Sequence, residues 1–167
     1  MSFPRLFPPP LAALSAAFIA VMAAIAAAPA AGEPAPRMAS LRVDEANVRT
    51  GPGRRYPIQW VYRSNGMPVE IVEEEGFWRR IRDWEGAEGW VLHSLLSNRR
   101  TLLVLEGPVM LRRGPRTADL AVARLAAGVT ARIRRCDPGW CHVEVGELEG
   151  WIRREGLWGL RPDEVIN

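Results

Sequence analysis

Short stretches in which apolar and polar residues alternate follow one another along most of the chain. In residues 58–63, IQWVYR, the side chains of Ile58, Trp60 and Tyr62 fall on one side of an extended strand. This period of two is the pattern of a strand with one buried face. No stretch between residue 40 and about residue 98 keeps a helical period over two turns, and we expect only a single helical turn, at residues 93–96. The pattern predicts an all-β fold.

Turn residues separate these strands at short intervals. Ser64-Asn65-Gly66 turns the chain, residues 74–76 (Glu-Glu-Gly) form a hairpin loop, residues 83–87 form another loop, and residues 89–91 (Gly-Trp-Val) are a last short strand. About five short strands in so few residues cannot form a broad sandwich. A small, strongly bent barrel is the economical architecture.

The same ordered series of motifs occurs twice: a Gly-Pro turn, a turn glycine, a tryptophan and a Gly-Trp pair. Residues 47–53 read NVRTGPG, and residues 110–116 read MLRRGPR. When these segments are aligned, with two single-residue deletions, the later motifs stay in register: Gly51 over Gly114, Gly66 over Gly128, Trp78 over Trp140 and Gly89-Trp90 over Gly150-Trp151. A repeat of this length indicates one folding unit used twice. We therefore expect a first domain at residues 40–98, a second at 99–160 and a C-terminal tail at 161–167.

The N-terminal region is typical of a secretory signal peptide. Arg5 is the one charge before an alanine-rich apolar run at residues 11–28, and small residues follow it. We expect residues 1–30 to be a signal peptide cleaved after Ala30, with Gly32 as the second choice. The alternative is a retained membrane anchor, since eighteen apolar residues can just span a bilayer. We expect a proline-rich flexible spacer at residues 31–39, and a periplasmic protein secreted across the inner membrane.

Three motifs of the first unit resemble the bacterial SH3-like domain family. They are the run NVRTGPGRRYPIQWVY at residues 47–62, the hairpin EEEGFW at 73–78 and the closing Gly-Trp pair at 89–90. The joining segment, residues 89–105, is similar to an exported tandem subgroup of that family. The resemblance implies two tandem SH3-like β-barrels over residues 40 to about 160. It also implies cell-wall targeting, because such domains bind peptidoglycan or its stem peptides. The alternative function is a periplasmic adaptor that holds an extended peptide of a partner protein.

The first unit keeps more of the polar and aromatic residues of the family than the second. Asn47 and Tyr56 correspond to Met110 and Asp119 in the second unit. Trp84 lies in a charged loop and Trp90 at the Gly-Trp step, and we expect both rings to be exposed, where they suit sugar faces and peptide stems. Trp60, Trp78 and Trp140 are expected to pack inside. The predicted ligand-binding residues are therefore Asn47, Arg49, Tyr56, Trp84 and Trp90.

The two cysteines flank a predicted hairpin. Across it Cys136 and Cys141 face each other within the separation that a disulfide needs, so we expect a bond between them. The same alignment predicts an ion pair between Glu74 and Arg79 in the first unit. A metal site made of the two cysteines and His142 lacks a fourth ligand, and neighbouring strand residues point to opposite faces. A nucleophilic cysteine paired with His142 fails for the same geometric reason.

Charge and composition narrow the function classes further. All 22 basic residues are arginine, and the net charge is only +3. Charges of both signs alternate along the strands, as expected for a solvated surface, although Arg112, Arg113 and Arg116 and the group at 132–135 could touch anionic lipid or wall polymer. The sequence holds no catalytic set, metal cluster, phosphate loop or nucleic-acid motif. We expect a non-catalytic binding module without metal, cofactor or nucleic acid, with membrane contact only if the N-terminal segment is retained.

Overall fold

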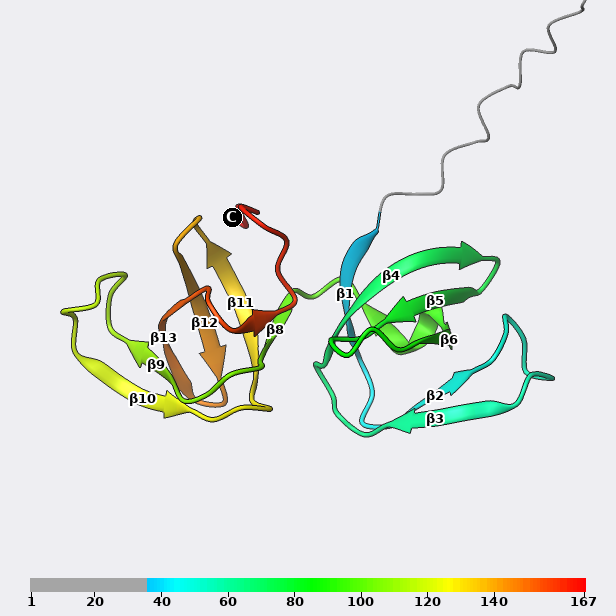
Figure 1. The fold of residues 1–167 in the computed structure, drawn as a ribbon. Coiled ribbons are helices and arrows are strands. Elements are labelled where there is room, and N and C mark those ends of the chain that lie inside the picture. Colours follow the sequence, from blue (N-terminus) through cyan, green and yellow to red (C-terminus); the bar gives the residue numbers. More distant parts are fainter. Residues whose placement is uncertain (1–35) are drawn as a thin grey trace, which may run out of the picture. The chain divides into compact units, whose positions relative to one another are not determined.

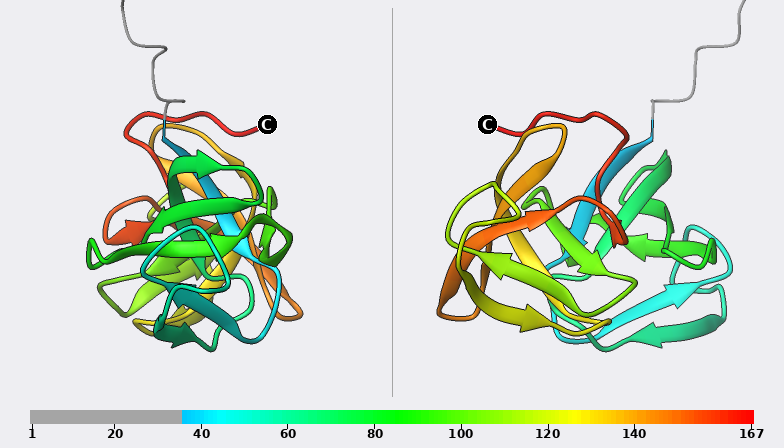
Figure 2. Two further views of the ribbon diagram at one scale, coloured as in Figure 1. Left: turned by 90° about the vertical axis from the view of Figure 1, so that its right-hand side faces the viewer. Right: turned by 60° about the vertical axis from the view of Figure 1, so that its left-hand side comes forward.

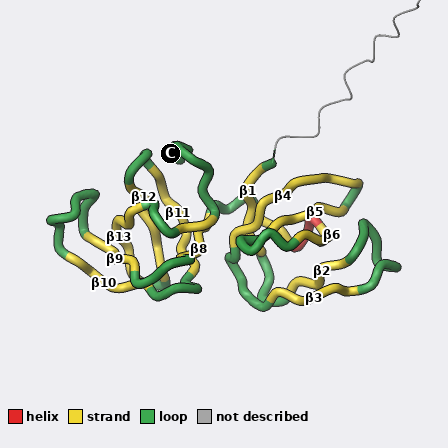
Figure 3. Tube along the Cα trace, in the orientation of Figure 1, coloured by secondary structure: helices red, strands yellow, loops and turns green. Residues whose placement is uncertain are grey.

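The computed structural model of the protein describes residues 36–167, so the predicted signal peptide lies outside the described residues. Within them, each repeat forms its own seven-stranded antiparallel sheet (Figure 1). Strands and loops make up nearly all of this part, and the one short helical turn is η1, His93–Leu95 (Figure 3). No helix in residues 36–167 is long and apolar enough to cross a membrane. The all-β fold with two tandem barrels is confirmed.

The two sheets have the same strand order. It is β3-β2-β6-β5-β4-β1-β7 in the first barrel and β10-β9-β13-β12-β11-β8-β14 in the second. The first sheet contains β1 (Arg37–Leu41), β2 (Ala46–Arg49), β3 (Ile58–Tyr62), β4 (Pro68–Glu75), β5 (Trp78–Arg82), β6 (Glu88–Leu92) and β7 (Leu96–Ser97). The second contains β8 (Thr101–Val104), β9 (Val109–Arg112), β10 (Ala121–Leu125), β11 (Thr130–Cys136), β12 (Trp140–Val145), β13 (Leu148–Arg153) and β14 (Leu157–Trp158).

Each sheet bends strongly (Figure 2). Each also encloses its own apolar core. Bending lets a short sheet bury one face of every strand, which is how a small barrel removes apolar side chains from water. The first core is made by buried aliphatic side chains such as Leu41, Val48, Val69, Ile81 and Val91. The second is made by Leu102, Val104, Leu111, Val143 and Ile152. The alternation predicted for β3 is weaker than expected, since Ile58 is 48% exposed.

The first barrel begins earlier than the sequence indicated. We expected a flexible spacer up to residue 39, but β1 starts at Arg37. Ala39 is 2% exposed and pairs with Val69 of β4. The expectation was wrong for residues 37–39 because they pair with β4, from Arg37 opposite Ile71 to Ala39 opposite Val69, and a pairing with a strand about thirty residues away leaves no mark in the local sequence.

The corresponding hairpins of the two barrels carry different cross-strand links. Glu74 lies opposite Arg79, and their side chains form an ion pair with an N–O distance of 3.0 Å. At the equivalent place Cys136 lies opposite Cys141, and the two form a disulfide between fully buried sulfurs. Both links predicted from the alignment are present.

The C-terminal tail is attached to the second barrel. The main chains of Ile166 and Cys136 donate to each other's carbonyl oxygens, at 3.0 and 2.8 Å. The Arg100 guanidinium binds both carboxylate oxygens of Glu164, at 2.6 and 2.9 Å. This hydrogen bonding lowers the pKa of Glu164 from 4.5 to about 2, against the opposing effect of burial. The tail therefore extends the second barrel beyond its last strand.

Reduction of the disulfide should loosen the second hairpin selectively. An ion pair near the surface, such as the partly exposed Glu74–Arg79 pair, stabilises by roughly 0.2 to 1 kcal/mol, whereas closing a short covalent ring stabilises by about 2 kcal/mol. We expect amide hydrogen exchange to accelerate around Cys136 and Cys141 when reductant is added, while exchange around Glu74 and Arg79 stays unchanged. Equal loss of protection in both hairpins would contradict this expectation.

Acid should release the tail before it unfolds the barrels. Because the pKa of Glu164 is lower in the folded protein than its ordinary value of 4.5, its contribution to stability is present above that value and is lost as the pH falls toward about 2. The protection factors of the Cys136 and Ile166 amides should fall over this window. In the Glu164→Gln variant these protection factors should be low already at neutral pH, and they should change little between pH 4.5 and about 2. An unchanged profile in the wild type would show that the pair does not hold the tail.

Candidate functional site

The loop between β2 and β3 is closed by one aromatic ring packed against a glycine. A Cβ atom on Gly51 would lie 2.6 Å from the ring of Tyr56, so no larger residue fits there without moving the ring. The Tyr56 amide donates to the Gly53 carbonyl at 3.2 Å, and the Thr50 amide donates to the Pro57 carbonyl at 3.1 Å. The Gly-Pro motif found in the sequence therefore specifies a compact loop.

Arg49 holds this loop from inside. It is the last residue of β2, and one nitrogen of its guanidinium donates to the carbonyl oxygens of Tyr56, at 2.7 Å, and Arg54, at 3.2 Å. A guanidinium presents its donors in a fixed planar fork, which makes it suitable for bridging two carbonyl groups. Arg49 thus fixes the position of Arg54 on the rim of the adjoining groove.

A groove of about 300 Å³ lies beside this loop on the first barrel. Its walls come from the end of the β1–β2 loop, β2, the β2–β3 loop, β5, β6 and η1. The lining residues are Glu45, Asn47, Arg49, Arg54, Trp78, Leu92 and Leu95. We call this set the first groove.

The first groove combines an apolar surface with charges of both signs. Trp78 and Leu92 lie opposite each other on β5 and β6, and both are partly buried. The carboxylate of Glu45 pairs loosely with Arg63 at 3.7 Å, and both side chains are largely exposed, so it stays available to a ligand. Glu45 is the one carboxylate among the lining residues, which gives no acid–base pair. The arrangement suits binding of a short chain that carries an amine and a carboxylate.

The predicted ligand residues do not all meet in this groove. Asn47 and Arg49 line it together. Tyr56 lies behind it, within the loop that Arg49 holds. Trp84 is 36% exposed, as expected, but lies outside the groove on the loop between β5 and β6. The binding role of all four stays a prediction.

Trp90 is buried, and the expectation that its ring is exposed was wrong. Only 8% of the residue is accessible. It lies in the middle of β6, where its cross-strand neighbours are Arg80 of β5 and Arg49 of β2. The apolar stems of such long side chains cover a ring on the same face of a sheet. Trp90 therefore supports the barrel wall.

Five lining residues were missed in the sequence: Glu45, Arg54, Trp78, Leu92 and Leu95. Trp78 was expected to pack inside, yet it contributes to the groove, opposite Leu92. The register of the β4–β5 hairpin could have shown which face of the sheet Trp78 lies on. Its neighbour Leu92 follows only from the pairing of β6 with β5. Arg54 lies in a run of two arginines with nothing to distinguish it from Arg55.

A buried hydrogen-bond network holds the loop that carries Trp84. The Tyr62 hydroxyl donates to Asp83 at 2.6 Å, and the amides of Glu85 and Ala87 donate to the other oxygen of that carboxylate, at 3.0 and 2.9 Å. Burial and then the hydrogen bond to Asp83 raise the pKa of Tyr62 above its usual range. The second barrel has Leu125 and Val145 at these positions and lacks the network.

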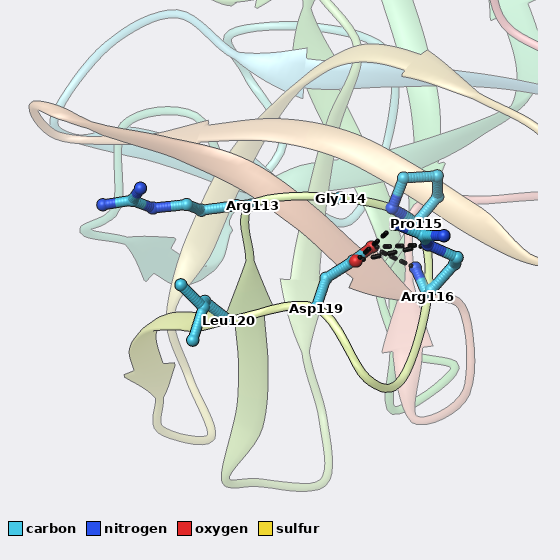
Figure 4. Close-up of a pocket in the computed structure, with 6 residues that line it drawn as sticks. All are labelled: Arg113, Gly114, Pro115, Arg116, Asp119 and Leu120. Carbon is cyan, nitrogen blue, oxygen red and sulfur yellow. Dashed lines mark hydrogen bonds and ion pairs between the residues drawn. The ribbon is translucent and has the colours of Figure 1, made fainter.

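The second barrel builds the same loop frame with a different side chain. Asp119 takes the place of Tyr56, its carboxylate lies against Gly114, and Arg112 donates to its carbonyl at 2.8 Å. Figure 4 shows the hollow at this loop, where the Asp119 carboxylate points to Arg116. It accepts from the Arg116 amide at 3.0 Å and from its guanidinium at 3.1 Å. The one carboxylate that lines this hollow, that of Asp119, is therefore already paired with Arg116.

The sequence model described as the bacterial SH3 domain matches residues 42–98 and 106–159, which together make up more than half of the chain. The chain belongs to the bacterial SH3 domain family. Bacterial SH3 domains are cell-wall-binding modules and generally bind peptidoglycan. Each matched segment falls within one barrel and begins just after that barrel's first strand, β1 or β8.

One curated relative is the Bacillus subtilis protein named “Putative N-acetylmuramoyl-L-alanine amidase YrvJ”. It is 27% identical over 128 residues, which cover 70% of this chain and 24% of that protein. The chain described here therefore matches about a quarter of the length of this relative.

Solved structures of NlpC proteins are distant neighbours. NlpC2 and NlpC1 from Trichomonas vaginalis are 14% and 12% identical, each with a TM-score of 0.34, over 73% and 77% of this chain and 47% of each of theirs. An NlpC/P60 family protein from Bacillus cereus is 14% identical, with a TM-score of 0.34, over 75% of this chain and 57% of its own.

Removing the loop-holding arginine should open the loop in either barrel. Arg49→Met loses both carbonyl contacts, and we expect the free energy of local opening of the loop to fall by about 1 to 2 kcal/mol. Hydrogen exchange of the Thr50 amide reports this directly. Arg112→Met is the matched variant, and there the Arg113 amide should exchange faster while Thr50 stays protected. Unchanged protection in both variants would show that the arginines do not hold the loops.

Proposed function

We propose that this protein is an exported, non-catalytic module that binds peptidoglycan through its stem peptides, with the first groove as the binding site. The observation that carries the proposal is the combination of an apolar surface at Trp78 with charges of opposite sign at Glu45 and Arg54. Stem peptides are short chains with small apolar side chains, carboxylates and free amines. A groove with this lining complements each of these groups.

Asn47 supports the same assignment. It is exposed on β2 and lies in the groove beside Arg49. A side-chain amide both donates and accepts hydrogen bonds, as recognition of a peptide backbone requires. Membership of the bacterial SH3 family adds that wall binding is the general role of such domains.

We further propose a periplasmic location. The support is the N-terminal sequence, residues 1–30, with its single charge, apolar run and small-residue exit. A disulfide between Cys136 and Cys141 agrees with an oxidising compartment.

An adaptor for an extended peptide is the second candidate, and one feature favours it. β3 ends the order of the first sheet, and Ile58 and Gln59 on it are exposed. An edge strand with free backbone groups can accept an added strand from a partner.

Cosedimentation with purified wall sacculi tests the proposed function. The wild type should pellet with sacculi, and Arg54→Gln should weaken the binding about tenfold through the lost carboxylate contact. Arg55→Gln is the matched control, because Arg55 is the next residue and does not line the groove. It should bind like the wild type.

Two other outcomes decide between the alternatives. Absence of wild-type binding to sacculi would exclude the wall-binding function and leave the adaptor. Equal binding by Arg54→Gln and Arg55→Gln would exclude the first groove as the site. Release of soluble muropeptides by the wild type, abolished by one point mutation, would contradict the proposal of a non-catalytic module.

A further inference from the structure

Arg153 occupies in the second barrel the position that Leu92 has in the first. Leu92 lies opposite Trp78 across β5 and β6, and Arg153 lies opposite Trp140 across β12 and β13. Trp78 and Trp140 are equivalent in the repeat. The second barrel thus has the long, positively charged side chain of Arg153 where the first groove has the apolar side chain of Leu92.

The Arg153 side chain spans the place where the second groove would be. Its guanidinium carbon lies 5.3 Å from the centre of the Trp140 ring, over the ring face. One terminal nitrogen donates to the Thr117 hydroxyl at 3.2 Å, and the other pairs with Glu155 at 3.2 Å. The guanidinium therefore joins the aromatic wall to the β9–β10 loop.

Thr117 is the counterpart of Arg54 on the rim of the first groove. In the first loop the Tyr56 amide donates to the Gly53 carbonyl, and in the second the Asp119 amide donates to the Arg116 carbonyl. These equivalent bonds fix the register between the loops, so residue 117 corresponds to residue 54. Arg153 consequently contacts the equivalents of two residues that line the first groove, Trp78 and Arg54.

We propose that Arg153 closes the groove of the second barrel, so that this barrel takes no stem peptide while an arginine stands where the first barrel has Leu92. The inference rests on the proposed function of the first groove. A ligand entering the second groove must displace the guanidinium from the Trp140 face and from Thr117. The amine of a stem peptide would also meet a fixed positive charge there. One chain then binds one stem peptide.

The closure depends on side-chain contacts at the surface rather than on the barrel core. The Arg153 side chain is 55% exposed. Replacing it should leave the fold intact, which circular dichroism of each variant checks. This makes the two barrels suitable for a reciprocal exchange of side chains.

Titration calorimetry with soluble muropeptides, prepared by muramidase digestion of sacculi, tests the gain of a site. Pro108→Glu/Met110→Asn/Thr117→Arg gives the second barrel the counterparts of Glu45, Asn47 and Arg54 but keeps Arg153, and it should bind one muropeptide per chain. Adding Arg153→Leu to this variant should raise the stoichiometry to two. The two proteins differ only at residue 153.

The reverse exchange tests the loss of a site. Arg54→Thr/Leu92→Arg gives the first barrel the threonine and arginine of the second, and its muropeptide affinity should be about tenfold below that of Arg54→Thr.

An unchanged affinity, or one site in both second-barrel variants, would overturn the role of Arg153. Two sites in the wild type would overturn it as well. A wild type that binds no muropeptide would instead refute the proposed function, and this inference with it.

Discussion

Both barrels close where a glycine of one strand lies against another strand. A Cβ atom on Gly89 would collide with Val48, and one on Gly150 would collide with the Arg112 carbonyl and the Leu111 side chain. Only glycine permits this approach, which brings β6 to β2 and β13 to β9. The next residue on each strand, Trp90 or Trp151, then lies beside an arginine that holds the neighbouring loop. The first groove exists because this closure places β2, β5 and β6 side by side.

The two copies share this backbone and differ in the side chains placed on it. An arginine holds the loop after β2 and after β9, but the loop is filled by a tyrosine ring in one copy and a carboxylate in the other. The hairpins carry an ion pair in one copy and a disulfide in the other. One frame can therefore support an open groove and a closed one, because the frame depends on glycines and main-chain hydrogen bonds rather than on the groove residues.

Several arginines within residues 36–167 connect segments of the same barrel. Arg49, Arg112 and Arg154 donate to main-chain carbonyls, and Arg134 pairs with Glu144. A guanidinium has several donors in fixed directions and can satisfy carbonyls that a loop leaves unpaired. This use accounts for part of the arginine content without a polyanionic partner.

Local pattern in the sequence was enough to determine the repeat, the strands β3 to β6 and the facing pairs of two corresponding hairpins. Glu74 and Arg79, like Cys136 and Cys141, are brought together by one turn, and a period of two fixes which residues face each other. The burial of Trp90, the early start of β1 at Arg37 and the pairing of Trp78 with Leu92 were decided only by the tertiary structure. Each of these depends on which strands become neighbours when the sheet closes. Which strands become neighbours is determined by packing between segments that are distant in sequence. A local sequence pattern contains no information about that packing.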